Sequence, residues 1–317
     1  MSGAPATTSP AAIERNDRTR TADLSIVMIN KNDPEIAETL PVLLAHARAS
    51  RHTFEFIVVD ASAPRFESVR RRHPEVRWIA FDPEGRGVSI AAQRNTGVAE
   101  SRGDIVVFVD VGCVPREGWL DALVEFIVDG TEDICAGPTL ADTAGGGIYA
   151  QRTVSSVGPR YLPQAGTGNL AVRRGVFEVV GGFDHHFDYG SDVDFTWRTV
   201  ERGYRIREIP TAVVEHDWGV LSRSSWRTQV RRSFLYGRAS ARLYGKHRNR
   251  LRRILKDDPM VVAYPVFLLG LPVALIWPWY LLLLVVAGYR NRRHRPLEVV
   301  ADHLIYGAGV LRELVAR

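Results

Sequence analysis

Short apolar runs alternate with helix-spaced segments along the first third of the chain. The strand-like runs, rich in Val, Ile and Phe, cover residues 24–29, 54–60, 76–82 and 104–110. The helix-like segments cover residues 34–49, 66–74 and 87–102. Strands this apolar are typical of a parallel sheet that is buried on both faces. The alternation therefore predicts an α/β fold with a mostly parallel, Rossmann-like sheet and flanking helices.

Polar side chains stand where three of these strands end: Asn30, Asp60 and Asp110. In such sheets, ligands bind beyond the carboxyl ends of the strands. The chain lacks the G-x-G-x-x-G and G-x-x-x-x-G-K-[ST] motifs, which excludes the common dinucleotide and NTPase loops, and it has no cysteine–histidine grouping with zinc spacing. Strand-end carboxylates can instead bind ribose hydroxyls, base N–H groups or a divalent cation.

The last third of the chain contains a charge-free stretch, residues 260–289. A stretch well beyond 18 apolar residues predicts a membrane-embedded segment, here assigned to residues 259–290. Gly270, Pro272 and Pro278 interrupt it, so a re-entrant insertion and a tilted single span both remain open. The alternative is a buried helical hairpin in a soluble core.

Basic and aromatic residues interleave in the segment before this stretch, residues 221–258, and the formal net charge of the chain is +5. Such a segment suits anionic lipid headgroups or nucleic acid, and the adjacent charge-free stretch favours lipid over nucleic acid. Residues 291–317 predict an amphipathic tail. Residues 1–22 lack the apolar core of a signal peptide and predict a disordered leader. The basic flanks and the two cysteines favour the cytoplasmic face of the cell membrane.

Six sequence segments in order resemble one known family. They are SIVMINKND, FIVVDASA, QRNTGVAESRGDIVVFVDVGCVP, GTGNLAVRRGVFEVVGGFD, YGSDVDFTWRTVERGYRI and AVVEHDW. Together they resemble inverting family 2 glycosyltransferases, which have the GT-A nucleotide-diphospho-sugar transferase fold. The resemblance covers roughly residues 24–218, which leads us to expect a GT-A domain over residues 23–220.

The resemblance implies a nucleotide-diphosphate sugar as donor and assigns five donor-binding residues. Asp60 would hydrogen-bond the nucleobase, and Asn30 would line the same pocket. Arg94 and Asn95 would face the donor, with Arg94 pairing with the diphosphate. Asp110 matches the first acid of the family's D-x-D motif and would contact the ribose or the metal-bridged diphosphate.

The D-x-D motif departs from the family pattern because it reads Asp110-Val111-Gly112. In the family, the second acid ligates Mg²⁺ or Mn²⁺. One carboxylate can suffice when substrate phosphates complete the coordination, and His216 matches the family's late metal-contacting histidine. We therefore expect a divalent cation held by Asp110 and His216. Neutralisation of the diphosphate by Arg and Lys side chains, without a metal, stays open.

The acceptor side lies in residues 181–198. Asp192 matches the aspartate that the family uses as catalytic base, while Ser191 replaces the preceding acid and is also a plausible helix N-cap. By the same resemblance, Gly168 and Asn169 lie under the sugar, and Asp194 orients the acceptor. Inverting transfer needs one base on the face opposite the leaving diphosphate, so a single carboxylate is enough.

These observations predict a membrane-associated inverting glycosyltransferase. The enzyme would move a sugar to a hydroxyl of a lipid-linked or cell-envelope glycan acceptor. Two alternatives remain open: a glycosyltransferase that modifies a soluble secondary metabolite, and a nucleotide-sugar-binding pseudoenzyme that acts as a scaffold.

Overall fold

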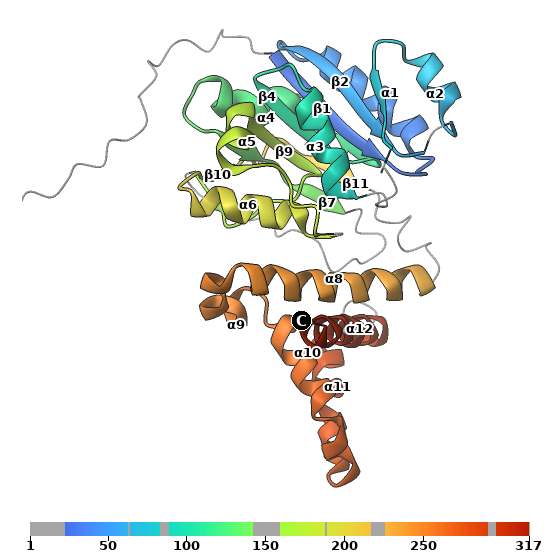
Figure 1. Ribbon diagram of the computed structural model, residues 1–317, viewed down its shortest axis with the longest axis vertical. Coiled ribbons are helices and arrows are strands. Elements are labelled where there is room, and N and C mark those ends of the chain that lie inside the picture. The colour runs from blue at the N-terminus through green and yellow to red at the C-terminus, as the bar shows by residue number, and fades with distance from the viewer. Residues whose placement is uncertain are drawn as a thin grey trace, which may run out of the picture.

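The computed structural model describes residues 23–62, 64–82, 89–141, 159–187, 189–216, 226–290 and 296–316. The predicted leader, residues 1–22, lies outside these described residues. The chain forms an α/β body, a long helix beneath it and a helical hairpin that projects away from the body (Figure 1). The site lies in the body and on the long helix.

Two sheets form the body. Among the described residues, the larger sheet has eight strands in the order β3-β2-β1-β4-β9-β6-β10-β8, and the smaller has three in the order β5-β11-β7. The strands of the larger sheet are β1 (Asp23–Asn30), β2 (Thr53–Asp60), β3 (Arg77–Ala80), β4 (Ile105–Val109), β6 (Ile134–Ala136), β8 (Tyr161–Leu162), β9 (Asn169–Arg173) and β10 (Ile206–Glu208). Those of the smaller sheet are β5 (Cys113–Pro115), β7 (Thr139–Ala141) and β11 (Val214–His216).

The register of the parallel strands brings the predicted polar residues to one edge. β1 pairs in parallel with β2 and with β4, and Asn30 stands opposite Asp60. Along β1, Ile26 and Val27 enter separate hydrophobic clusters on opposite faces of the sheet, as expected for a strand covered on both sides. The predicted α/β fold with a mostly parallel sheet is confirmed.

Helices cover both faces of the larger sheet. They are α1 (Ile36–Arg48), α2 (Glu67–Arg72), α3 (Ile90–Glu100), α4 (Trp119–Val128), α5 (Arg174–Val180) and α6 (Ser191–Glu201). The prediction that Ser191 caps α6 is wrong. Gly190 holds the N-cap position with a φ of 80°, which glycine adopts at little cost, and Ser191 is the buried first helical residue.

The remaining helices form the C-terminal third of the chain. They are α8 (Trp226–Lys246), η2 (Arg248–Arg253), α9 (Ile254–Asp257), α10 (Met260–Leu269), η3 (Leu271–Leu275), η4 (Pro278–Leu281), α11 (Leu282–Arg290) and α12 (Pro296–Val315). α8 and α12 cross in close contact through glycines. A Cβ atom at Gly237 would collide with the backbone of Tyr306, and one at Gly309 with the backbone of Phe234. Tight packing therefore fixes α12 against α8.

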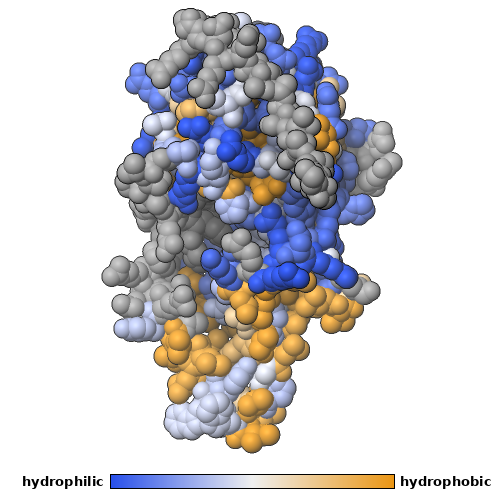
Figure 2. Space-filling model, turned by 90° about the vertical axis from the view of Figure 1, so that its left-hand side faces the viewer, coloured by the Kyte–Doolittle hydropathy of each residue, from blue (hydrophilic) through white to orange (hydrophobic). Residues whose placement is uncertain are grey.

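The charge-free stretch forms a projecting structure, the apolar prong (residues 260–290), which consists of α10, η3, η4 and α11. None of the described helices is long and apolar enough to cross a membrane. Leu275 and Ile276, at the turn, are 88% and 90% exposed, which contradicts the alternative of a hairpin buried in a soluble core. Figure 2 shows hydrophobic residues gathered at the end of the molecule where the prong projects.

Candidate active site

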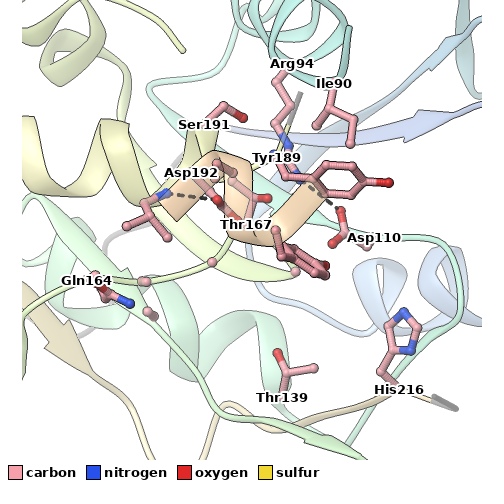
Figure 3. A pocket seen from close by; sticks show the side chains of 18 of the residues that line it. Ile90, Arg94, Asp110, Thr139, Gln164, Thr167, Tyr189, Ser191, Asp192 and His216 are labelled. Atoms are coloured by element: carbon pink, nitrogen blue, oxygen red, sulfur yellow. Dashed lines mark hydrogen bonds and ion pairs between the residues drawn. The ribbon is translucent and has the colours of Figure 1, made fainter. Parts of the chain in front are cut away.

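A cavity of about 1040 Å³ lies at the edge of the sheet where β4 ends. It is lined from the strand-end turn, α3, the loop before β9, α6 and α8. Five residues predicted from the sequence line it: Arg94, Asp110, Gly168, Asp192 and His216. Figure 3 shows four of their side chains around one space. Segments far apart in the sequence therefore build a single site.

Asp110 and Arg94 form the charged centre of the cavity. Arg94 reaches from α3 to within 3.6 Å of Asp110 Oδ1, and its side chain is 9% exposed against 39% for Asp110. Gly168 lies beside this pair, since a Cβ atom there would be 3.3 Å from Asp110 Oδ2. A buried guanidinium next to a more open carboxylate can bind a diphosphate while the carboxylate meets a hydroxyl or a cation.

Asn30 and Asp60 form a buried polar cluster at the ends of β1 and β2. The amide of Asn30 donates to Asp60 Oδ1 at 3.1 Å, and the N–H of Ser62 donates to the same oxygen at 3.0 Å. Asn30 Oδ1 is buried and has no hydrogen-bond partner among the described residues. Neither side chain lines the cavity. Residues 83–88, which precede α3, lie outside the described part of the chain. The contact of Asn30 and Asp60 with a nucleobase stays a prediction.

Two predicted contacts, Asn95 and Asn169, have side chains that hold the protein's own structure. Asn95 accepts from the N–H of Phe183 at 2.7 Å and donates to its carbonyl at 2.8 Å. Asn169 donates to the carbonyl of Ala212 at 2.7 Å and accepts from the indole N–H of Trp119 at 2.8 Å. These bonds position the loops around the cavity, and neither side chain lines it.

Asp192 lies in the first turn of α6 and faces the cavity (Figure 3). Its Oδ1 accepts from the N–H of Val193 at 2.9 Å. A Cβ atom at Gly166 would lie 3.5 Å from its Oδ2, so the loop before β9 passes close to this oxygen. The backbone bond fixes the carboxylate through one oxygen and leaves the other beside the loop as the candidate proton acceptor.

Asp194 does not reach the cavity. Its side chain is fully buried, where Arg198 Nε donates to Oδ2 at 2.8 Å and His247 Nε2 lies 2.9 Å from Oδ1. Lys246 Nζ lies 2.6 Å from Oδ1. Burial alone would raise the pKa of Asp194, but the hydrogen bonds from His247, Lys246 and Arg198 hold the pKa below its ordinary value. Instead of the predicted acceptor contact, Asp194 joins α6 to the end of α8.

Other cavity residues were not predicted from the sequence. Arg232, Tyr236 and Ser240 reach the cavity from α8, and Glu35 reaches it from the start of α1. The basic, aromatic composition of α8 was visible in the sequence, but only the fold shows which of its residues face the body. In the sequence, Glu35 looks like any acidic residue at the start of a helix. The one hint of a further role is the glycine at position 112, which leaves the D-x-D motif without its second acid.

Asp110 and His216 are the predicted metal residues, and both line the cavity. Within the described ranges, no three His, Cys, Asp or Glu side chains form a ready-made metal group. The carboxylate oxygens of Asp110 and the ring nitrogens of His216 suit Mg²⁺ or Mn²⁺, which often take several ligands from substrate phosphates and water. These residues fit a cation that is shared with a bound diphosphate.

The sheet, with an acid at a strand end and a second acid on a helix across one cavity, defines a GT-A-like α/β protein. The family model for glycosyl transferase family 2 matches residues 25–183, half of the chain. The chain belongs to this family, which confirms the family predicted from the six segments.

Two curated relatives are glycosyltransferases. The chain is 29% identical over 265 residues to the pre-mycofactocin glycosyltransferase of Mycobacterium tuberculosis, covering 78% of this chain and 53% of the relative. It is 36% identical over 136 residues to the glycosyltransferase AglE of Haloferax volcanii, covering 40% of this chain and 43% of the relative. The chain thus spans about half the length of the curated relatives it matches.

Two solved structures share the fold. The mannosyltransferase PcManGT of Pyrobaculum calidifontis, in complex with GDP-Man and Mn²⁺, has a TM-score of 0.65 at 18% identity, covering 95% of this chain and 89% of that one. GalNAc-T7, with UDP, GalNAc and Mn²⁺, has a TM-score of 0.51 at 14% identity, covering 63% and 44%. At these identities the likeness concerns the fold alone.

Proposed function

We propose that the chain transfers a sugar from a nucleotide-diphosphate donor to a hydroxyl acceptor, with inversion at the anomeric carbon. The observation that carries the proposal is the placement of Asp110 with Arg94, and of Asp192, on the wall of one cavity. The first pair suits the donor diphosphate, and Asp192 suits the acceptor hydroxyl. The fold relatives named above were solved with GDP-Man or with UDP and GalNAc.

The chemistry is a single displacement. The acceptor oxygen attacks C1 of the sugar, its proton passes to Asp192, and the bond from C1 to the diphosphate oxygen breaks with the electron pair leaving on the diphosphate. One base on the face opposite the leaving group is sufficient, so the replacement of the preceding acid by Ser191 is no obstacle. Arg94 stabilises the negative charge that grows on the diphosphate.

A divalent cation, Mg²⁺ or Mn²⁺, fits beside this arrangement. Asp110 and His216 would hold it together with the donor phosphates, and when bound it neutralises charge on the leaving diphosphate. Mn²⁺ accompanies the nucleotide in both fold relatives. The chain's own part is to present the carboxylate and the imidazole at the cavity wall.

The position of α8 supports a proposal of membrane association. α8 contributes Arg232 and Tyr236 to the cavity and packs against α12, which in turn packs against α10 of the apolar prong. Exposed cations stand near the base of the prong: Arg248, Arg252 and Lys256. We propose that the prong inserts into one leaflet on the cytoplasmic face of the cell membrane while these cations meet anionic headgroups. A lipid-linked or cell-envelope acceptor would then enter along α8.

The test of this function is the Asp192→Asn variant, assayed for donor binding and for transfer. The amide keeps the size of the side chain but cannot accept the proton, so donor affinity should stay unchanged while transfer falls at least about 100-fold. Glu178→Gln, an exposed acid on α5, is the matched control and should behave as wild type. Transfer by Asp192→Asn near the wild-type rate would refute the assignment of the base.

A further inference from the structure

Gly112 stands where the family carries its second metal-binding acid, and the local backbone explains the replacement. Its φ is +86°, a left-handed conformation that glycine adopts freely and that residues with a side chain rarely adopt. The turn between β4 and β5 is thus built for glycine. Since residue 112 is glycine, a carboxylate at this point would come from another part of the chain.

The carboxylate of Glu35 lies beside the turn at Gly112. A Cβ atom placed on Gly112 would lie 3.0 Å from Glu35 Oε2 and 3.4 Å from His216 Nε2. Glu35 and His216 therefore flank the position that a side chain at residue 112 would occupy. Both line the cavity together with Asp110.

The start of α1 and the turn at Gly112 are fastened to each other. The N–H of Gly112 donates to Thr39 Oγ1 in α1 at 2.9 Å. The N–H of Glu35 donates to Asp33 Oδ1 at 3.0 Å, which shapes the turn before the helix. Glu35 occupies the N-cap position without a side-chain capping bond. Its carboxylate is directed to the turn by the fold and is not used to cap its helix.

We propose that Glu35 supplies the carboxylate that the glycine at position 112 lacks, and that it holds the divalent cation together with His216 and Asp110. The inference rests on the proposed function, because the phosphates of the donor complete the coordination. Two carboxylates and an imidazole form a suitable partial set for Mn²⁺ or Mg²⁺. The described residues alone hold no complete metal group, so tight metal binding should require the nucleotide.

The experiment is calorimetric titration of the full chain with UDP, GDP and dTDP, in excess Mn²⁺ and in EDTA. For the nucleotide that binds wild type, Kd should be lower in Mn²⁺ than in EDTA. Glu35→Gln should weaken binding in Mn²⁺ at least about tenfold, since an amide is a poor ligand for a hard cation. In EDTA the same variant should bind the diphosphate as tightly as wild type or more tightly, because a negative charge has been removed.

Two further variants make the result specific. Glu38→Gln, exposed one turn along the same helix, should match wild type in both conditions. Glu35→Asp keeps a carboxylate and should retain more of the Mn²⁺ effect than Glu35→Gln. If Glu35 only oriented His216 by a hydrogen bond, the amide would serve nearly as well, and an unchanged Mn²⁺ effect in Glu35→Gln would overturn the proposal.

The outcomes also separate this inference from the proposed function. Nucleotide binding by wild type that is the same in Mn²⁺ and EDTA would overturn the metal role of Glu35 and leave the transferase proposal standing. Failure of wild type to bind any of the three nucleotides would overturn both.

Discussion

Asp194 should be among the largest single contributors to the stability of the α6–α8 junction. Its side chain is fully buried, and its two oxygens meet Arg198 from its own helix and Lys246 and His247 from the end of α8. Asp194→Asn keeps the volume of the side chain but leaves Arg198 and Lys246 without their counter-charge. Removing one member of a buried ion pair costs about 3–5 kcal/mol.

The lower end of that range applies here because the side chain of Lys246 is 37% exposed and can regain water. A loss of about 3 kcal/mol in the free energy of unfolding lowers Tm by roughly 6–12 °C for a domain of this size. The assay is thermal unfolding of the full chain followed by circular dichroism. The control is Glu75→Gln, which breaks an exposed ion pair with Arg48 and should cost less than about 1 kcal/mol.

The pH dependence supplies a second, independent reading. Since the folded-state pKa of Asp194 is below its ordinary value, the carboxylate stabilises the fold at pH above the unfolded value of about 4. That stability is lost as pH falls through the folded-state pKa. The difference in Tm between wild type and Asp194→Asn should still be present at pH 5 and shrink below about pH 4. Equal Tm values for the two proteins at pH 7 would refute the reasoning.

Three further predictions concern the buried polar cluster of Asn30 and Asp60, the apolar prong and the acceptor. Asp60→Ala should weaken nucleotide binding about 10- to 100-fold, the value of a charge-assisted hydrogen bond, and an unchanged Kd by calorimetry would remove Asp60 from the donor site. A double change in the prong, Leu275→Glu with Ile276→Glu, should abolish flotation with phosphatidylglycerol-containing vesicles. The control Val179→Glu, which changes an exposed residue on the body, should still float. Flotation of the double variant would contradict insertion of the prong. Arg232→Ala should raise KM for the acceptor without altering donor Kd, and an unaffected KM would exclude an acceptor contact.

The sequence was sufficient for the parallel sheet and for much of the cavity. Apolar runs bounded by polar residues defined β1, β2 and β4, and the shared edge of parallel strands then brought Asn30 next to Asp60. The interruptions at Gly270 and Pro278 coincide with breaks between the short helices of the apolar prong. These features depend on local patterns, which a single sequence displays.

The functions of individual polar side chains were harder to predict because their partners are distant in the sequence. Asn169 bonds to Ala212, 43 residues away, and Asp194 bonds to His247, 53 residues away. A family motif indicates that such a residue matters but does not say whether its atoms face a ligand or the protein. Glu35 was not predicted because no family motif includes it. Only the fold brings it next to Gly112 and His216, which are distant in the sequence.

The configuration of the sugar in the product tests the central claim most directly. The purified chain would be supplied with a nucleotide sugar of known anomeric configuration and an acceptor, and the anomeric proton of the new glycoside would be observed by NMR. A single displacement with Asp192 as base predicts the opposite configuration at C1 from that of the donor. Retention of the donor configuration would contradict the account.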